Sequence, residues 1–188
     1  MTLFDEAIRF AVEKHSGMTR KGEPAPYILH PLEAAAIVGT LTCDEEVLAA
    51  AVLHDTVEDT GVNPEEIARR FGARVAALVA SETEDKRPEL PPEESWRMRK
   101  EQSLRKLREA SDPAVRYLWL GDKLSNLRAL SRAQKREGAA VWTRFHQKDP
   151  AQQAWYYRTI DGLLSGLRDS DAWQEYHALV ETVFSEVL

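Results

Sequence analysis

The sequence predicts an all-α protein, a single-domain helical bundle of about eight to ten helices over residues 1–188. Apolar residues recur at helical spacing along most of the chain, and the sequence has no convincing alternating strand pattern. Asp, Asn and Pro residues stand where several of these segments begin, as helix start signals do. A length of 188 residues with 43% apolar residues suits one compact domain.

Five helices are expected in the first part of the chain. Prolines at positions 24 and 26 hold an extended loop, and Pro31 suits the first turn of the helix that follows it. Asp44 can cap the third helix, and Asn63 with Pro64 opens the fourth. The expected helices cover residues 2–16, 31–41, 45–55, 64–71 and 73–82.

The second part of the chain begins with a charged, proline-rich loop over residues 84–93. A long charged helix is expected over 93–110, and Asp112 followed by Pro113 begins the next helix, which carries the apolar face of Leu120, Leu124 and Leu127. Asp149-Pro150 and Asp171 mark the beginnings of the C-terminal helices, over about 147–187.

Composition and charge exclude several classes of function. The chain has 25 Lys and Arg against 31 Asp and Glu, a net charge of −6, which argues against a general nucleic-acid-binding protein. One cysteine, Cys43, excludes an intramolecular disulfide and any multi-cysteine zinc module. An acidic N-terminus and the lack of an apolar run of ~18–20 residues predict a cytoplasmic protein with no membrane partner. The sequence leaves open whether the protein forms a homo-oligomer.

Four residues spread along the chain form a candidate metal-binding set: His30, His54, Asp55 and Asp122. Two imidazoles and two carboxylates suit Mn²⁺, Fe²⁺ or Zn²⁺. With no thiolate and with open coordination positions left over, such a set favours metal-assisted hydrolysis over a closed structural site.

A second acidic pair, Glu58 and Asp59, follows four residues after His54 and Asp55. On a continuous helix Glu58 would lie above His54 and Asp59 above Asp55. A carboxylate outside the metal ligands can serve as general acid or base. The alternative is that the first pair ends a helix and the second lies in a solvated loop.

Basic and polar residues cluster near the same landmarks and indicate an anionic substrate. Arg20 and Lys21 precede the loop that leads to His30. A further five candidates for contact with this substrate are Lys123, Asn126, Arg128, Arg99 and Lys100. The alternative for most charges of 93–108 is an exposed helix with intrahelical ion pairs. His15, at the end of the first helix, is expected to be structural.

The segments 20–22, 26–31, 51–60 and 122–128 together resemble the HD-superfamily hydrolase domain of RelA/SpoT proteins. The likeness is greater to its stand-alone version, the small alarmone hydrolases, and it runs over about residues 3–130. The longer loop after Arg20 departs from the family pattern. So does Gly121, which stands where the family usually has Ala.

The resemblance implies an HD-type helical fold and a Mn²⁺-dependent 3′-pyrophosphohydrolase acting on the guanine nucleotide (p)ppGpp. It implies that Glu58 and Asp59 are the catalytic pair and that Arg20 and Lys21 contact the nucleotide. Asn126 and Arg128 would line the nucleoside side. It implies the metal ligands His30, His54, Asp55 and Asp122. Two alternatives are an HD phosphohydrolase with another small phosphate substrate and a non-catalytic nucleotide-binding module.

Overall fold

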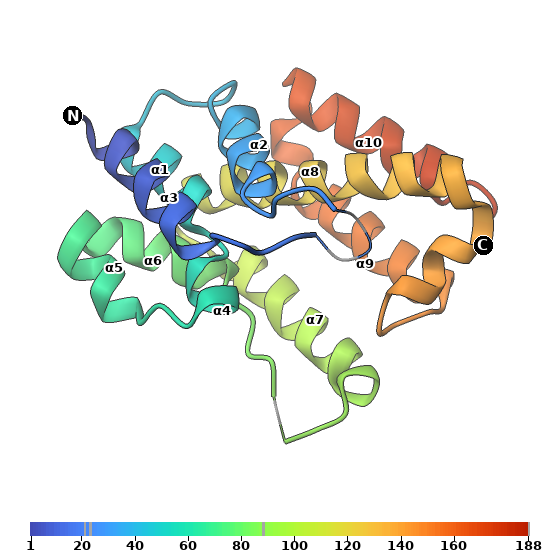
Figure 1. Ribbon diagram of the computed structural model, residues 1–188. Coiled ribbons are helices and arrows are strands. Elements are labelled where there is room, and N and C mark those ends of the chain that lie inside the picture. The colour runs from blue at the N-terminus through green and yellow to red at the C-terminus, as the bar shows by residue number, and fades with distance from the viewer. Residues whose placement is uncertain (21, 23, 88, 188) are drawn as a thin grey trace. The chain divides into compact units, whose positions relative to one another are not determined.

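The computed structural model describes residues 1–20, 22, 24–87 and 89–187, and all the regular elements in these residues are helices (Figure 1). The all-α prediction is therefore confirmed. The α-helices are α1 (Leu3–Lys14), α2 (Leu29–Val38), α3 (Glu45–Leu53), α4 (Thr56–Thr60), α5 (Pro64–Phe71), α6 (Ala73–Glu82), α7 (Pro92–Glu109), α8 (Ala114–Glu137), α9 (Pro150–Leu163) and α10 (Asp171–Val183). Two 3₁₀ helices, η1 (Gly138–Arg144) and η2 (Ser165–Leu167), were not predicted.

Side-chain caps place the beginnings of several helices. Asp44, Asn63 and Asp149 each accept a hydrogen bond from the backbone N–H two residues further on. Thr2 and Asp5 form a reciprocal capping box at α1. Each cap satisfies a backbone donor that the first turn of a helix leaves without a partner.

The third helix ends earlier than the sequence predicts. It stops at Leu53, and His54 and Asp55 form a short turn before α4 begins at Thr56. Two side chains bond to carbonyls near the end of α3: His54 Nδ1 lies 2.8 Å from Ala51 O, and Thr56 Oγ1 donates to Leu53 O at 2.7 Å. These local bonds compete with helix continuation, so the predicted end of this helix at residue 55 is wrong, and His54 does not share a continuous helix with Glu58.

The chain divides into two compact units. The first unit comprises Met1–Thr83 and Ala110–Ser125, and the second comprises Glu84–Glu109 and the described residues from Asn126 onward. Helix α8 contributes its first half to one unit and its second half to the other. The organisation of residues 1–188 as one domain stays a prediction.

Helix α3 is the centre of the first unit. It packs against α1, α2 and α6, and α5 packs against α6 (Figure 1). The run of three alanines from Ala49 to Ala51, with Val52 and Leu53, is at most 2% exposed. A helix apolar on all sides needs neighbours on every face, and small alanines let those neighbours approach closely. The end of this buried helix carries His54 into the interior.

Gly121 lets helix α8 lie directly against α2. A Cβ atom at Gly121 would stand 2.7 Å from Val38 Cγ2 and 2.8 Å from the Ala34 carbonyl oxygen. Only a residue without a side chain fits this approach. The contact fixes the position of the next residue, Asp122, in the same unit as His30.

Aromatic side chains fill the core of the second unit. Helix α9 packs against both α7 and α10. The ring of Trp142 stacks on Phe184 at 5.8 Å, and Trp96 meets the ring of Tyr156 at 6.0 Å. Such pairs contribute to packing beyond their buried area. In the part of the chain that the structure describes, no helix is both long enough and apolar enough to cross a membrane.

Candidate metal centre

Four predicted ligands meet in the first unit. His30 comes from α2, His54 and Asp55 from the turn between α3 and α4, and Asp122 from the middle of α8. His30 Nε2 lies 3.1 Å from Asp122 Oδ1 and 3.4 Å from Asp55 Oδ2. His54 Nε2 lies 3.1 Å from Asp55 Oδ2 and 3.6 Å from Asp122 Oδ1. The structure thus brings together all four residues from three separate parts of the sequence.

Hydrogen bonds on the outer side of each imidazole fix which ring nitrogen faces this cluster. His54 Nδ1 lies 2.8 Å from the Ala51 carbonyl, which can only accept, so Nδ1 carries the proton. His30 Nδ1 lies 2.8 Å from Ser125 Oγ, whose own proton goes to Glu33 Oε2 at 2.7 Å. His30 Nδ1 is therefore also the donor. Both neutral rings present the lone pair of Nε2 to the cluster.

The cluster needs a positive charge at its centre. The two Nε2 atoms stand 3.3 Å apart, and all four side chains are at most 17% exposed. Two facing lone pairs and two buried carboxylates repel one another unless a cation lies among them. Burial lowers the pKa of His54, but Asp55 and Asp122 outweigh burial and hold that pKa well above its ordinary value. The surroundings of His54 therefore favour a positive charge at the centre of the cluster.

The donor set fits a divalent cation. His30, His54 and Asp122 each offer a ligand atom, and these atoms lie within 4.8 Å of one another. Asp55 Oδ2 faces both imidazoles from the fourth side. Nitrogen and carboxylate ligands without sulfur suit the borderline ions Mn²⁺, Fe²⁺ and Zn²⁺. These four residues would hold such an ion, and a bound ion would make a coordinated water acidic.

Tyr27 links the cluster to the second acidic pair. Its hydroxyl lies 2.7 Å from Asp55 Oδ2 and 2.8 Å from Asp59 Oδ2. A phenol has one proton, so it donates to one carboxylate at a time. Burial and the two carboxylates raise the pKa of Tyr27, so it stays protonated. Asp59 is therefore held beside the cluster, and the half-buried Glu58 precedes it in α4.

Sequence reasoning did not assign a role to Tyr27. It precedes His30 by three residues in an irregular loop, and helical spacing carries no information about where a loop side chain points. His15 stacks on the Tyr27 ring at 5.0 Å. It caps the C-terminal end of α1, is 2% exposed, and finds no hydrogen-bond partner for either nitrogen within the described chain. Burial lowers the pKa of His15, which favours the neutral ring.

The predicted substrate contacts of the first unit differ in their surroundings. Arg20 lies in the loop before α2, where its backbone N–H bonds to Ala25 O at 3.2 Å. Lys21 lies outside the described residues. Lys123 bonds to Asp122 Oδ2, and its Nζ lies 3.8 Å from Glu82 Oε2. Lys123 therefore contacts carboxylates of the first unit rather than standing out into solvent.

The other predicted substrate contacts belong to the second unit. Arg99 and Lys100 both bond to Glu84, and Arg128 makes a two-pronged pair with Glu175 at 2.7 and 2.5 Å. Arg99 is only 8% exposed. Asn126 follows Asp122 by one turn of α8 and is half-buried. These pairs join different parts of the second unit and are not the intrahelical pairs of the alternative, and the substrate roles of these residues stay predictions.

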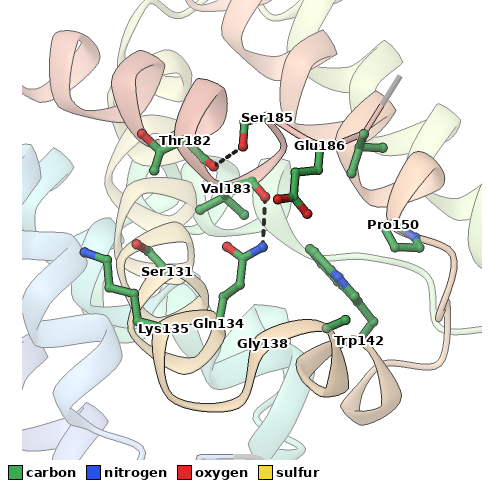
Figure 2. A pocket seen from close by; sticks show the side chains of 12 residues that line it. Ser131, Gln134, Lys135, Gly138, Trp142, Pro150, Thr182, Val183, Ser185 and Glu186 are labelled. Atoms are coloured by element: carbon green, nitrogen blue, oxygen red, sulfur yellow. Dashed lines mark hydrogen bonds between the residues drawn. The ribbon is translucent and has the colours of Figure 1, made fainter.

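A pocket of about 500 Å³ lies in the second unit (Figure 2). Trp142, Gln134 and Glu186 surround it, and Gln134 Nε2 donates to the Val183 carbonyl at 3.1 Å. Residues of α8, η1, α9, α10 and the chain after α10 complete its lining. The residues that line it include no predicted site residue, so this pocket is distinct from the cluster of histidines and aspartates.

Comparison with known proteins agrees with this geometry. Residues 7–151 match the model of the HD domain family. A guanosine-3′,5′-bis(diphosphate) 3′-pyrophosphohydrolase of Aquifex aeolicus is 43% identical over 140 residues, which are 73% of this chain but 19% of the Aquifex protein. The chain thus spans less than a fifth of that relative.

Two further relatives are similar over most of their length. The pyrophosphohydrolase MESH1 of Danio rerio is 37% identical over 171 residues, 89% of this chain and 85% of the zebrafish protein. The solved structure of a metazoan SpoT ortholog that hydrolyses ppGpp aligns with a TM-score of 0.71 and 27% identity, covering 99% of this chain and 96% of that one. The chain belongs to the HD domain family, and within it to the hydrolases of the RelA/SpoT type.

Proposed function

We propose that the protein is a metal-dependent 3′-pyrophosphohydrolase of (p)ppGpp and that His30, His54, Asp55 and Asp122 hold its divalent ion. The observation that carries the proposal is that His30 Nε2 and His54 Nε2 lie 3.3 Å apart beside two carboxylates. Ser125 and the Ala51 carbonyl bond to the Nδ1 atoms and so hold the two rings in this orientation. The similar Aquifex and zebrafish proteins are guanosine-3′,5′-bis(diphosphate) 3′-pyrophosphohydrolases, which supports this substrate. Mn²⁺ is the ion we expect first, because the set has oxygen ligands and no thiolate.

The reaction cleaves the bond between the 3′ oxygen and phosphorus. A bound divalent ion supplies Lewis acidity, which makes water acidic at neutral pH and polarises phosphoryl oxygens. The oxygen of water becomes part of pyrophosphate, and the 3′ oxygen of GDP or GTP leaves and takes up a proton.

The acidic pair supplies the proton transfers in this proposal. Glu58 and Asp59 accept a proton from water and return one to the leaving 3′ oxygen. Tyr27 holds Asp59 beside Asp55 through its hydroxyl, so the acid is oriented before substrate binds. Arg20 and Lys21 are the residues we expect to contact the anionic nucleotide. We further expect a cytoplasmic protein that acts on a free nucleotide rather than on nucleic acid.

The test is release of pyrophosphate from ppGpp by purified protein with Mn²⁺. We expect release that stops on chelation of the metal and is lost in His54→Ala and Asp55→Ala. His146→Ala is the matched control, because His146 is exposed and lies in the second unit. Folded, Mn²⁺-loaded protein that leaves ppGpp intact would contradict the proposal. Cleavage of another phosphate ester from a panel would then favour a different HD phosphohydrolase, and tight binding without turnover would favour a nucleotide-binding module.

A further inference from the structure

Glu82 is a buried acid that the proposed reaction does not use. It is the last residue of α6, and its side chain is 3% exposed. Its Oε1 atom is buried and has no hydrogen-bond partner in the described part of the chain. Leaving a buried carboxylate oxygen without a partner costs free energy, so such a group calls for an explanation.

A positive charge close to Glu82 is shared with a proposed metal ligand. Lys123 Nζ lies 3.8 Å from Glu82 Oε2 and bonds to Asp122 Oδ2. The same ammonium lies 4.8 Å from the centre of the Trp119 ring, and the Lys123 side chain is 15% exposed. The ammonium is thus largely removed from water and stands between two carboxylates.

Asp122 faces different partners with its two oxygens. Its Oδ1 lies 3.1 Å from His30 Nε2, inside the histidine cluster, and its Oδ2 bonds to Lys123. An ammonium on Oδ2 draws electron density away from Oδ1 and lowers the attraction of the carboxylate for a cation. Burial raises the pKa of Glu82 to about 8, and a divalent cation in the nearby cluster would favour the charged carboxylate. A negative charge on Glu82 has the opposite effect on Asp122, because it shares the positive charge of the ammonium.

We propose that Glu82 is a positioning residue of the metal centre: it shares the charge of the Lys123 ammonium with Asp122 and so keeps Asp122 available to a divalent cation. The inference rests on the proposed metal centre and adds to it a residue outside the ligand set. Burial makes the effect strong, since charges a few ångströms apart in a protein interior interact more strongly than in water.

Glu82 acts through Lys123, so the two residues must be coupled. The test is Mn²⁺ affinity, measured by isothermal titration on the full chain, for Glu82→Gln, Lys123→Met and the double variant. We expect Glu82→Gln to weaken Mn²⁺ binding about five- to tenfold and Lys123→Met to strengthen it. In the Lys123→Met background, Glu82→Gln should change the affinity by less than about twofold.

Two controls separate this effect from loss of charge or of folding. Glu181→Gln removes one negative charge from an exposed position on α10 and should leave Mn²⁺ affinity unchanged. Circular dichroism checks that each variant is folded. Lys123→Met keeps an aliphatic chain over Trp119, so it remains a test if Glu82→Gln does not fold, and binding no tighter than in the wild type would overturn the inference.

The outcomes distinguish this inference from the proposed function. A wild-type protein that binds no Mn²⁺ contradicts the metal centre itself. Wild-type binding with unchanged affinity in Glu82→Gln overturns the role of Glu82 alone. An equal loss of affinity with and without Lys123 also overturns it, because Glu82 would then act directly rather than through the ammonium.

Discussion

Residues that do not touch the proposed ion still decide how its ligands are presented. Tyr27 is one of them, because its hydroxyl lies within hydrogen-bond distance of both Asp55 and Asp59 and links the two. Removing this hydroxyl leaves the imidazole rings of His30 and His54 in place but frees the Asp59 carboxylate to rotate. In the proposed reaction the position of Asp59 matters for proton transfer, whereas the proposed metal ligands keep their own contacts.

We therefore expect Tyr27→Phe to lower kcat about tenfold or more while changing Mn²⁺ affinity much less. Steady-state kinetics and Mn²⁺ titration on the same preparation measure the two effects. Tyr117→Phe, on a half-buried tyrosine of α8, is the matched control. Equal loss of kcat and of Mn²⁺ affinity would mean that Tyr27 supports the ligands rather than the acid.

Ser125 has the corresponding role for His30. Ser125→Ala removes the acceptor of the Nδ1 proton and also the donor to Glu33. Partners behind a metal-binding histidine typically contribute about ten- to a hundredfold to metal affinity, and we expect a loss in that range. Ser131→Ala is the control, because Ser131 is also buried on α8 but lies in the second unit. Equal affinities in the two variants would contradict the tautomer assigned to His30.

Gly121 tests whether close packing of helices positions a ligand. In Gly121→Ala the new methyl meets Val38 and the Ala34 carbonyl at less than 3 Å, and one of these is backbone. We expect a loss of about 1–3 kcal/mol in the free energy of unfolding, with weaker Mn²⁺ binding as Asp122 moves. Chemical denaturation and metal titration measure both.

Gly162→Ala is the matched control for this substitution. Gly162 lies in α9, and a Cβ there meets nothing within 4 Å. Alanine is the better helix former, so this variant should be as stable as the wild type or more so. A Gly121→Ala protein with unchanged stability would mean that α8 and α2 can separate at little cost. That result would also remove the packing explanation for Gly at this position.

At the scale of elements, the positions where helices begin were the predictable part of the fold. Asp44, Asn63 and Asp149 mark helix beginnings in the sequence and cap them in the structure. The end of α3 was not predictable, because it depends on hydrogen bonds from His54 and Thr56 to carbonyls of α3. Apolar periodicity continues through that point and gives no sign of the break.

The same contrast holds for the candidate site. The chemistry of imidazole and carboxylate pointed to the proposed ligands in the sequence, since few other functions need those types together. Tyr27, Glu82 and the partners of Lys123 depend on which residues fold next to one another. A buried lysine between two acids has the same sequence signal as an exposed lysine, so only the structure separates the two.

Arg74 connects three elements by ion pairs. From α6 it reaches Asp44 at 2.6 Å and Glu46 at 2.9 Å near the beginning of α3, and Asp112 at 3.3 Å before α8. These side chains are roughly 40% exposed, so water and salt screen the pairs. We expect Arg74→Met to lower the free energy of unfolding by about 1 kcal/mol in low salt and less in high salt.

The pH dependence of this loss has a defined sign. Hydrogen bonding from Arg74 lowers the pKa of Asp44 below its ordinary 3.8. An acid with a lowered pKa stabilises the folded state above its unfolded pKa and loses that contribution as pH falls through the folded pKa. The difference between wild type and Arg74→Met should therefore be constant between about pH 5 and 8 and shrink below about pH 4. Urea denaturation across this range measures it, and a difference that grows in acid would contradict the ion-pair explanation.

At the scale of the whole molecule, the division into two units does not follow the order of the sequence. The first unit is completed by residues 110–125, and the second by residues 84–109. All four proposed ligands and the acidic pair belong to the first unit. No composition shift marks a boundary inside α8, so the sequence predicted one domain. The matched family model also runs across both units, from 7 to 151.

Metal binding can show how far the two units unfold independently. A ligand that binds only the folded state stabilises it by about 2.7 kcal/mol at a hundred times its Kd. If the units unfold separately, bound Mn²⁺ increases the protection from hydrogen exchange only for backbone amides of the unit that holds the ion. We expect Mn²⁺ to slow hydrogen exchange in α2, α3, α4 and residues 114–125 of α8, and to leave α9 and α10 unchanged. Mass spectrometry of peptides from the full chain measures each segment, with His54→Ala as the control that gains no protection. Equal protection of α9 and α10 would instead mean that both units unfold as one cooperative domain, as the sequence predicts.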